Sequence, residues 1–102
     1  MGTLYLAQDQ FNDALICYER ALEIRTRKLG PGHSRVAQTL KHLITLNEAI
    51  EDYPTALEYG ERALHIIQKI YGENHFHTSS VYLRIGSIYW MLGKQGIHKS
   101  NN

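Results

Sequence analysis

Histidines and a single cysteine are the residues of this sequence that could do the most chemistry. His33, His75 and His77 could ligate a metal ion, but His33 and His75 occupy equivalent positions of a segment that occurs twice in the sequence. This equivalence indicates a structural role at a connection between helices. A lone cysteine without a CxxC pair also gives no zinc-finger spacing. We therefore expect no bound metal and no other cofactor.

Residues for catalysis are equally hard to find in the sequence. The stretch GPGHS at 30–34 has glycines ahead of a predicted helix, but it lacks the preceding strand and the GxGxxG or GK[ST] pattern of a phosphate cradle. There is no HExxH, no nucleophile elbow and no recognisable pair of acid and base. Cys17, beside Tyr18 on the apolar side of a predicted helix, is expected to be a buried or half-buried packing residue. The chain is predicted not to be an enzyme.

Composition narrows the class of protein further. With 102 residues and 43% hydrophobic content, the chain can bury the core of one compact domain. A net charge of +1 is too small for the counterion release that drives nucleic-acid binding. No apolar run approaches the roughly 20 residues of a membrane-spanning helix. Because a single cysteine fits a reducing compartment, we expect a cytoplasmic protein that binds neither nucleic acid nor membrane.

Apolar residues recur at steps of three, four and seven, the spacing of one face of a helix. No period-two strand pattern occurs in the sequence, so the predicted fold class is all-α. Gly30 and Gly72 are expected to end two long helices. Ser34 and Thr78 are expected to cap the helices that follow, and Pro54 to lie in a first turn. The predicted helices span residues 2–9, 11–29, 34–51, 54–71 and 77–93.

The chain contains two similar segments, ALICYERALEIRTRKLGPGH from Ala14 to His33 and ALEYGERALHIIQKIYGENH from Ala56 to His75. A shift of 42 positions aligns the two copies, and such a period predicts helical units that stack on their neighbours to bury their apolar faces. The chain holds about two and a half units, so we expect a fragment or truncated form of a longer array. The predicted organisation is one repeat domain over 1–93 and a frayed tail over 94–102.

The spacing of Ala14, Tyr18 and Ala21, followed by LG and by His33 ahead of VAQTLKHL, resembles the tetratricopeptide repeat. The period is similar to the longer form found in kinesin light chains and in nephrocystin-3-like proteins. The resemblance covers nearly the whole chain and implies a right-handed α-α superhelix of helical hairpins. It also implies that small residues let paired helices approach closely. This sequence keeps five of them: Ala14, Ala21, Ala56, Ala63 and Gly86.

The same resemblance implies a binding surface. In that family the first helix of each pair lines the inner surface of the superhelix, which usually binds a peptide or protein segment. Here those helices are predicted at 34–51 and 77–93, and helical geometry selects the residues of their matching faces. The predicted groove residues are Gln38, Lys41, His42, Thr45, Glu48, Ser80, Leu83, Arg84, Ser87, Trp90 and Met91, with Leu6 nearby.

The chemistry of this groove predicts the kind of ligand. Kinesin light chains commonly carry paired asparagines in the stretch that matches Lys41 and His42, where they bind a peptide backbone, and this sequence lacks them. We expect instead a protein or peptide segment with acidic groups for Lys41 and Arg84. Its apolar groups would meet Leu83 and Trp90. Two alternatives stay open: Trp90 could be a packing residue for a further helix, and the charged residues could be a solvated polar face.

Two functions are therefore predicted. The first is a non-catalytic scaffold that binds a partner segment on the inner surface. The second is a structural segment that self-associates, because the helix at 77–93 would expose part of its apolar side where a companion helix is missing. By this second route we expect a homo-oligomer. The residues predicted for self-association are Val81, Tyr82, Ile85, Ile88, Tyr89 and Leu92.

Overall fold

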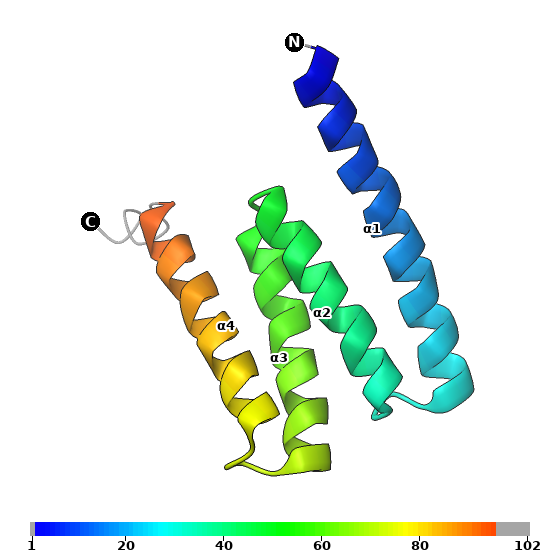
Figure 1. Ribbon diagram of the computed structural model, residues 1–102, viewed down its shortest axis with the longest axis vertical. Helices are drawn as coiled ribbons and strands as arrows, with labels where there is room; N and C mark the ends of the chain where they lie inside the picture. The colour runs from blue at the N-terminus through cyan, green and yellow to red at the C-terminus, as the bar shows by residue number, and fades with distance from the viewer. Residues whose placement is uncertain (1, 96–102) are drawn as a thin grey trace.

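Four α-helices make up the part of the chain that the structure describes. The computed structural model gives the backbone of residues 2–95 and the side chains of residues 9–95. Each helix packs along the next in an antiparallel row, with α1 and α4 at its two edges (Figure 1). No strand occurs within residues 2–95, which agrees with the predicted all-α class. The helices are α1 (Gly2–Leu29), α2 (Ser34–Ala49), α3 (Tyr53–Tyr71) and α4 (Phe76–Lys94).

The prediction of five helices is wrong, because the first two predicted helices form one continuous helix, α1. Before α3 the chain breaks at Glu51, whose φ of 63° is left-handed, and restarts with Asp52 as N-cap and Pro54 in the first turn. The repeat register places Gln10 and Asn12 at the positions of Asp52 and Pro54. The first copy therefore has neither the capping carboxylate nor the proline, and the helix continues through this point.

Gly30 and Gly72 end α1 and α3, as predicted. Their φ angles of 95° and 90° lie in a region that glycine adopts without the steric cost of a Cβ. The N–H of Gly30 donates to Thr26 O at 3.0 Å, and that of Gly72 donates to Gln68 O at 2.8 Å. Pro54 lies in the first turn of α3, where its missing N–H removes no hydrogen bond from the helix.

The N-caps of α2 and α4 are His33 and His75, not Ser34 and Thr78 as predicted. Each imidazole accepts a hydrogen bond at its Nδ1, at 3.0 Å, from the backbone N–H two residues further on. Thr78 instead lies fully buried within α4, and its hydroxyl donates to Gly72 O at 2.6 Å. The prediction that the two histidines serve the helix connections is therefore confirmed.

His75→Ala should destabilise the fold by about 1 kcal/mol, because it leaves a first-turn amide of α4 without an acceptor. His75→Asn should keep most of that stability, since asparagine is among the best N-caps. Urea denaturation followed by circular dichroism measures the difference between the two variants. Equal losses would show that the His75 ring acts through its packing on Tyr71, at 4.5 Å between centroids, and not as a cap.

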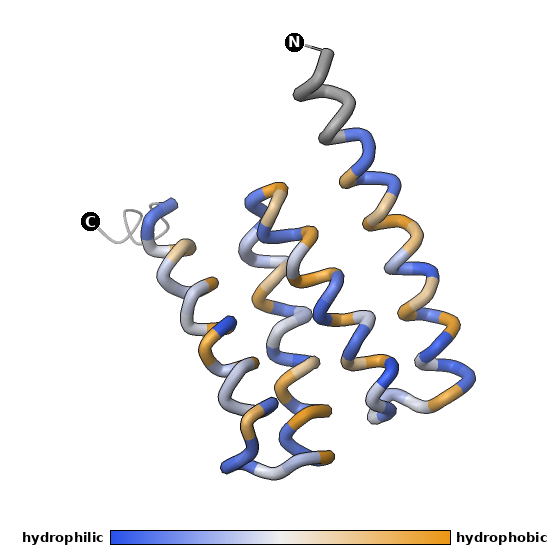
Figure 2. The backbone as a smooth tube through the Cα atoms, in the orientation of Figure 1, coloured by the Kyte–Doolittle hydropathy of each residue, from blue (hydrophilic) through white to orange (hydrophobic). Residues whose placement is uncertain are grey.

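The core fills the space between neighbouring helices. Figure 2 shows apolar residues returning at intervals along each helix, as the periodicity of the sequence requires. The most enclosed helix is α2, which packs between α1 and α3 and holds side chains that are completely buried. The buried apolar residues are Leu22, Val36, Ala37, Leu40, Leu43, Ile44, Tyr53, Ala56, Ala63, Ile66, Ile67, Val81, Ile85 and Ile88.

Small residues do mark close approaches between helices, with one correction. Ala56 and Ala63 on α3 are both 0% exposed, as predicted. Gly86 is exposed, and a Cβ added there would meet nothing within 4 Å, so its predicted packing role is wrong. The close approach is instead at Gly60, where an added Cβ would come within 3.2 Å of Ile85 Cγ1. Gly86 has no such role because within the described residues no helix covers that side of α4.

The edge helix α1 is less buried than its sequence predicts. Cys17 is exposed, so the prediction of a buried or half-buried thiol is wrong. Ala14 and Ala21 are only half-buried, unlike their counterparts on α3. Among the described elements α1 packs along α2 only, whereas α3 packs between α2 and α4. The side chain of Leu6 and residues 96–102 of the predicted tail lie outside the described residues.

Candidate interaction surfaces

The predicted groove residues of α2 and α4 meet at Arg84. Its guanidinium forms an ion pair with Glu48, with 3.0 Å between Nη2 and Oε1, and also donates to the Thr45 hydroxyl. Thr45 in turn donates to Lys41 O at 3.1 Å, one turn back along α2. These contacts join α2 directly to α4. We call this surface the α2–α4 face; it carries Gln38, Lys41, Thr45, Glu48, Ser80, Leu83, Arg84, Ser87 and Trp90.

The ion pair changes the charge that the α2–α4 face offers to a ligand. The side chains of Arg84 and Glu48 are 35% and 27% exposed, and their opposite charges offset each other. Lys41 therefore carries the positive charge that was predicted for this face. It lines a hollow of about 180 Å³ together with Ser34, Ala37, Gln38, Ile67, Tyr71 and His77.

Tyr71 and His77 are residues of this hollow that the sequence did not reveal. Their rings lie 4.7 Å apart, at the end of α3 and the start of α4. The prediction selected one face of each helix by periodicity, and residues at a connection between helices do not belong to such a face. The repeat of the segment through Gly72 and His75 was the available signal that this connection is structurally specified.

Leu83 and Trp90 give the α2–α4 face its apolar character. They lie two turns apart on α4 and are 75% and 64% exposed. The ammonium of Lys94 lies 4.7 Å from the centre of the Trp90 ring, a cation–π contact that restrains the ring at the surface. In the described structure Trp90 is thus a surface residue, available to a ligand.

Two predicted groove residues lie at the border of this face. His42 stacks on Tyr18 of α1, with ring centroids 4.8 Å apart, so it belongs to the contact between α1 and α2. Met91 is half-buried against the core. Ser80 and Ser87 are exposed on α4 beside Leu83. His42 and Met91 therefore lie at the edges of the α2–α4 face, and the role of this face as a binding groove stays a prediction.

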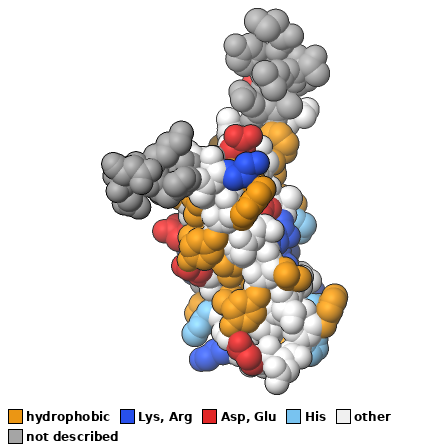
Figure 3. Space-filling model, turned by 90° about the vertical axis from the view of Figure 1, so that its left-hand side faces the viewer, with side chains coloured by type: hydrophobic (Ala, Val, Ile, Leu, Met, Phe, Trp, Pro, Cys, Tyr) orange, Lys and Arg blue, Asp and Glu red, His pale blue; other side chains and the backbone are white. Residues whose placement is uncertain are grey.

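The set predicted for self-association divides into buried and exposed members. Val81, Ile85 and Ile88 are at most 8% exposed, because they face α3 and belong to the core, so they cannot form an external contact. Leu92 is half-buried. Tyr82 and Tyr89 are 43% and 54% exposed. Figure 3, which faces α4, shows hydrophobic side chains distributed along this side of the molecule.

The two exposed tyrosines are tethered through their hydroxyl groups. Tyr82 donates to Glu73 at 2.8 Å and accepts from Gln68 at 3.1 Å, while Tyr89 donates to Glu61 at 3.4 Å. Hydrogen bonds from Gln68 and Tyr82 lower the pKa of the Glu73 carboxyl, and the bond to Glu73 raises the pKa of Tyr82. The network therefore favours an ionised Glu73 and a protonated Tyr82, the states in which their hydrogen bond forms.

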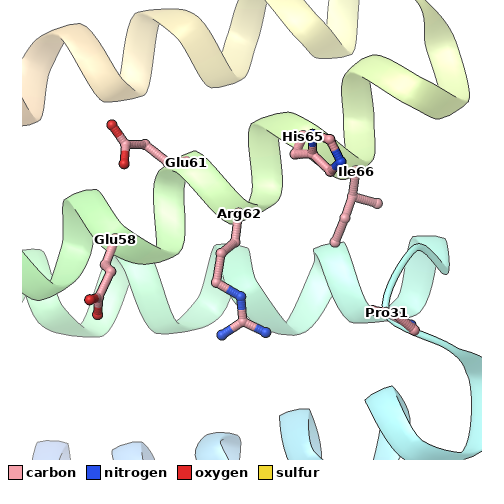
Figure 4. A pocket seen from close by; sticks show the side chains of 6 residues that line it. All are labelled: Pro31, Glu58, Glu61, Arg62, His65 and Ile66. Atoms are coloured by element: carbon pink, nitrogen blue, oxygen red, sulfur yellow. The ribbon is translucent and has the colours of Figure 1, made fainter.

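Larger hollows lie along α3, at residues that the sequence did not single out: one is lined by α3 and Pro31, the other by α1 and α3. One of about 420 Å³ is shown in Figure 4, where Arg62 points toward α1 and Glu61 toward α4. A second, of about 470 Å³, lies between α1 and α3 and shares Arg62; beside it, burial and the charge of Glu19 raise the pKa of Tyr59. We favour the α2–α4 face despite its smaller hollow, because it adds exposed apolar side chains to its charged groups.

The described part of the chain offers neither a metal site nor a membrane-spanning helix. Among residues 9–95 no three His, Cys, Asp or Glu side chains gather closely enough to hold a metal ion. In the same part of the chain, no helix combines the length and the apolar character needed to span a bilayer.

Antiparallel helices that recur with a 42-residue period and expose charged and apolar side chains define a helical-repeat protein. The sequence matches the tetratricopeptide repeat family over residues 1–66 and again over residues 39–96, and the chain belongs to this family. Tetratricopeptide repeats are non-enzymatic and generally mediate protein–protein interaction. The finer resemblance to kinesin light chains stays a prediction.

One relative is a much longer protein. The clustered mitochondria protein homolog of Candida albicans (strain SC5314 / ATCC MYA-2876) is 31% identical to this chain over 88 residues. The match covers 86% of this chain and 6% of that protein, so the chain spans a small part of the relative's length.

Proposed function

We propose that this chain is a non-catalytic scaffold that binds a segment of a partner protein on its α2–α4 face. The observation that carries the proposal is the exposure of Leu83 and Trp90 on α4, on the face that also carries Lys41 and a hollow lined by residues of α2, α3 and α4. Large side chains of this kind are common anchors at protein interfaces. The contact of Arg84 with Glu48 fixes α2 against α4, so the face is largely formed before a ligand arrives.

The proposed ligand is an extended segment with apolar side chains and at least one acidic group. The apolar groups would cover Leu83 and Trp90, and the acidic group would lie near Lys41. Because Arg84 is already paired with Glu48, the ligand is guided by Lys41 and by the Lys94 ammonium that lies over Trp90, and added salt should slow its association. The proposal also places the chain in the cytoplasm, where the exposed thiol of Cys17 would stay reduced.

Selection of peptides from a displayed random library tests this function. We expect the selected peptides to be rich in apolar and acidic residues. Trp90 is the only tryptophan of the sequence, so binding of a peptide that lacks tryptophan should shift its fluorescence to shorter wavelength. Trp90→Ala and Lys41→Glu should each weaken binding about tenfold or more, as measured by isothermal titration calorimetry.

His65→Ala is the matched control, because His65 is exposed and lines the hollow formed by α3 and Pro31. It should leave the affinity for the selected peptides unchanged. If the affinity for the peptides falls with His65→Ala but not with Trp90→Ala, the binding site lies at the hollow lined by His65 and not on the α2–α4 face. A library that yields no binding peptides would contradict the proposal.

Self-association is the second candidate function. It is favoured by the large apolar side chains that α4 exposes over its whole length, of which only Leu83 and Trp90 belong to the α2–α4 face. The others are Phe76, Tyr82 and Tyr89, which are 75%, 43% and 54% exposed. Exposed apolar surface of this extent commonly marks an interaction site.

A further inference from the structure

The repeat allows a comparison of equivalent residues on α2 and α4. Leu40 and Asn47 of α2 are 0% and 3% exposed, whereas their counterparts 42 positions later, Tyr82 and Tyr89, are 43% and 54% exposed. The positions that face the preceding helix show no such difference, since Leu43 and its counterpart Ile85 are both buried. Among the described helices, α2 packs along α1 on one side and α3 on the other, whereas α4 packs along α3 only. The exposed tyrosines therefore mark the side of α4 that no described helix covers in the way that α3 covers α2.

The opposite edge of the molecule lacks the complementary neighbour. Ile66 of α3 is 6% exposed, whereas its counterpart Ile24 on α1 is 44% exposed. Ala63 of α3 is fully buried, while its counterpart Ala21 is half-buried. Because α3 packs between α2 and α4 whereas α1 packs along α2 only, no described helix covers α1 on the side where α2 covers α3. We call this side of α1, with Ala14, Cys17, Ala21 and Ile24, the open side of α1.

By the repeat register, the open side of α4 corresponds to the side of α2 that packs on α3. The open side of α1 corresponds to the side of α3 that packs on α2. Where α2 packs along α3, the repeat positions that α4 and α1 leave more exposed are buried: Leu40 and Asn47 on α2, and Ala56 and Ala63 on α3. On α4 the tethered rings of Tyr82 and Tyr89 lie seven residues apart. On α1 the small side chains of Ala14 and Ala21 also lie seven residues apart. Large side chains on one helix over small side chains on the other, at the same two-turn spacing, give interdigitated helix packing.

We infer that the open side of α4 binds the open side of α1 of a second copy, head to tail, as α2 binds α3 within one chain. This inference specifies the second candidate function. The contact uses two different surfaces, so it is heterologous and can add further copies. It leaves Leu83 and Trp90 free, because these residues lie on the α2–α4 face beside the open side of α4. Binding of a peptide and association of copies are therefore separable.

Two charge substitutions each block one half of the contact. Gly86→Glu places a charge on the open side of α4, at an exposed position where a new side chain meets nothing within 4 Å. Ile24→Glu does the same on α1. Ile70→Glu is the matched control, since Ile70 is 43% exposed, like Ile24, but lies on neither open side. Analytical ultracentrifugation over a range of micromolar concentrations measures the mass of each protein and of their mixtures.

The measured mass of the wild-type protein and of Ile70→Glu should rise with concentration to more than twice the monomer mass of 11.7 kDa. Each blocked variant alone should associate at least about tenfold more weakly. An equimolar mixture of the two blocked variants should form a one-to-one complex and stop there, because one retains a free α1 and the other a free α4. A monomeric wild type, a mixture that stays monomeric, or an Ile24→Glu variant that still dimerises alone would overturn the inference. Peptides selected for the α2–α4 face should bind Ile24→Glu as they bind the wild type, whatever the outcome for association, because Ile24 lies on α1, away from that face.

Discussion

Ile85→Glu is expected to destabilise the fold strongly rather than to separate associated copies. Ile85 is 8% exposed and packs over Gly60 of α3 within the apolar core. Glutamate there loses apolar contacts and buries a carboxylate among apolar side chains, at a cost of about 4 kcal/mol or more. Domains of this size have a total stability of only about 5–15 kcal/mol. Thermal unfolding followed by circular dichroism should show Tm falling by on the order of 20 °C.

Leu83→Glu is the control for this experiment, since it makes the same kind of change two residues earlier on the same helix. Leu83 is 75% exposed, and surface substitutions of this kind alter stability by less than about 0.5 kcal/mol. Its Tm should lie within a few degrees of the wild type. An Ile85→Glu variant that melts together with Leu83→Glu would show that α4 packs on α3 through a different face from the one described.

The repeat predicted most of the fold, because the same residues specify the same turns in both copies. Gly30 and Gly72 occupy equivalent positions, and both end a helix with a left-handed φ. The register wrongly predicted a helix break before residue 11. At that point the first copy has Asn12 where the second has Pro54, and α1 continues. A repeat register aligns positions, but a helix ends because of the residues at those positions, and these differ between the two copies.

Burial was predicted less well than the helices were. Periodicity shows which side of a helix is apolar, but it does not show how many neighbours cover that side. Ala21 and Ala63 have the same place in the repeat, yet one is half-buried and the other fully buried. Cys17 was misassigned for the same reason, since it lies on α1 at the edge of the row. Counting the neighbours of each helix requires the three-dimensional arrangement.

The predicted groove residues of α2 and α4 do share one surface, but its charge differs from the prediction, because Arg84 is paired with Glu48. Its role as a binding site stays a prediction. Helical geometry placed Thr45, Glu48 and Arg84 on facing surfaces, and the structure brings all three together. Sequence spacing cannot show that Arg84 reaches Glu48, because that contact depends on the approach of two helices that are separated by a third. The helix caps were missed on different grounds: Ser and Thr are more common N-caps than His, and the commoner residues were chosen.

Leucine substituted for alanine at equivalent positions of the two copies should have very different effects. Ala63→Leu adds three carbon atoms to a fully buried site between packed helices, and overpacking of this kind costs about 1–3 kcal/mol. Ala21→Leu makes the same change on the half-buried side of α1, where the larger side chain can extend into solvent, so its cost should stay below about 0.5 kcal/mol. Urea denaturation of dilute protein should show a lowered midpoint for Ala63→Leu and an unchanged slope for both.

The dependence on protein concentration shows whether a loss of stability in Ala21→Leu arises within one chain or between copies. If copies associate through the open side of α1, then Ala21 becomes an interface residue as the concentration rises. The cost of Ala21→Leu should therefore increase with concentration, while that of Ala63→Leu should stay constant, because Ala63 is buried in every copy. Equal costs for the two variants in dilute protein would contradict the structure, because they would require Ala21 to be enclosed within a single chain.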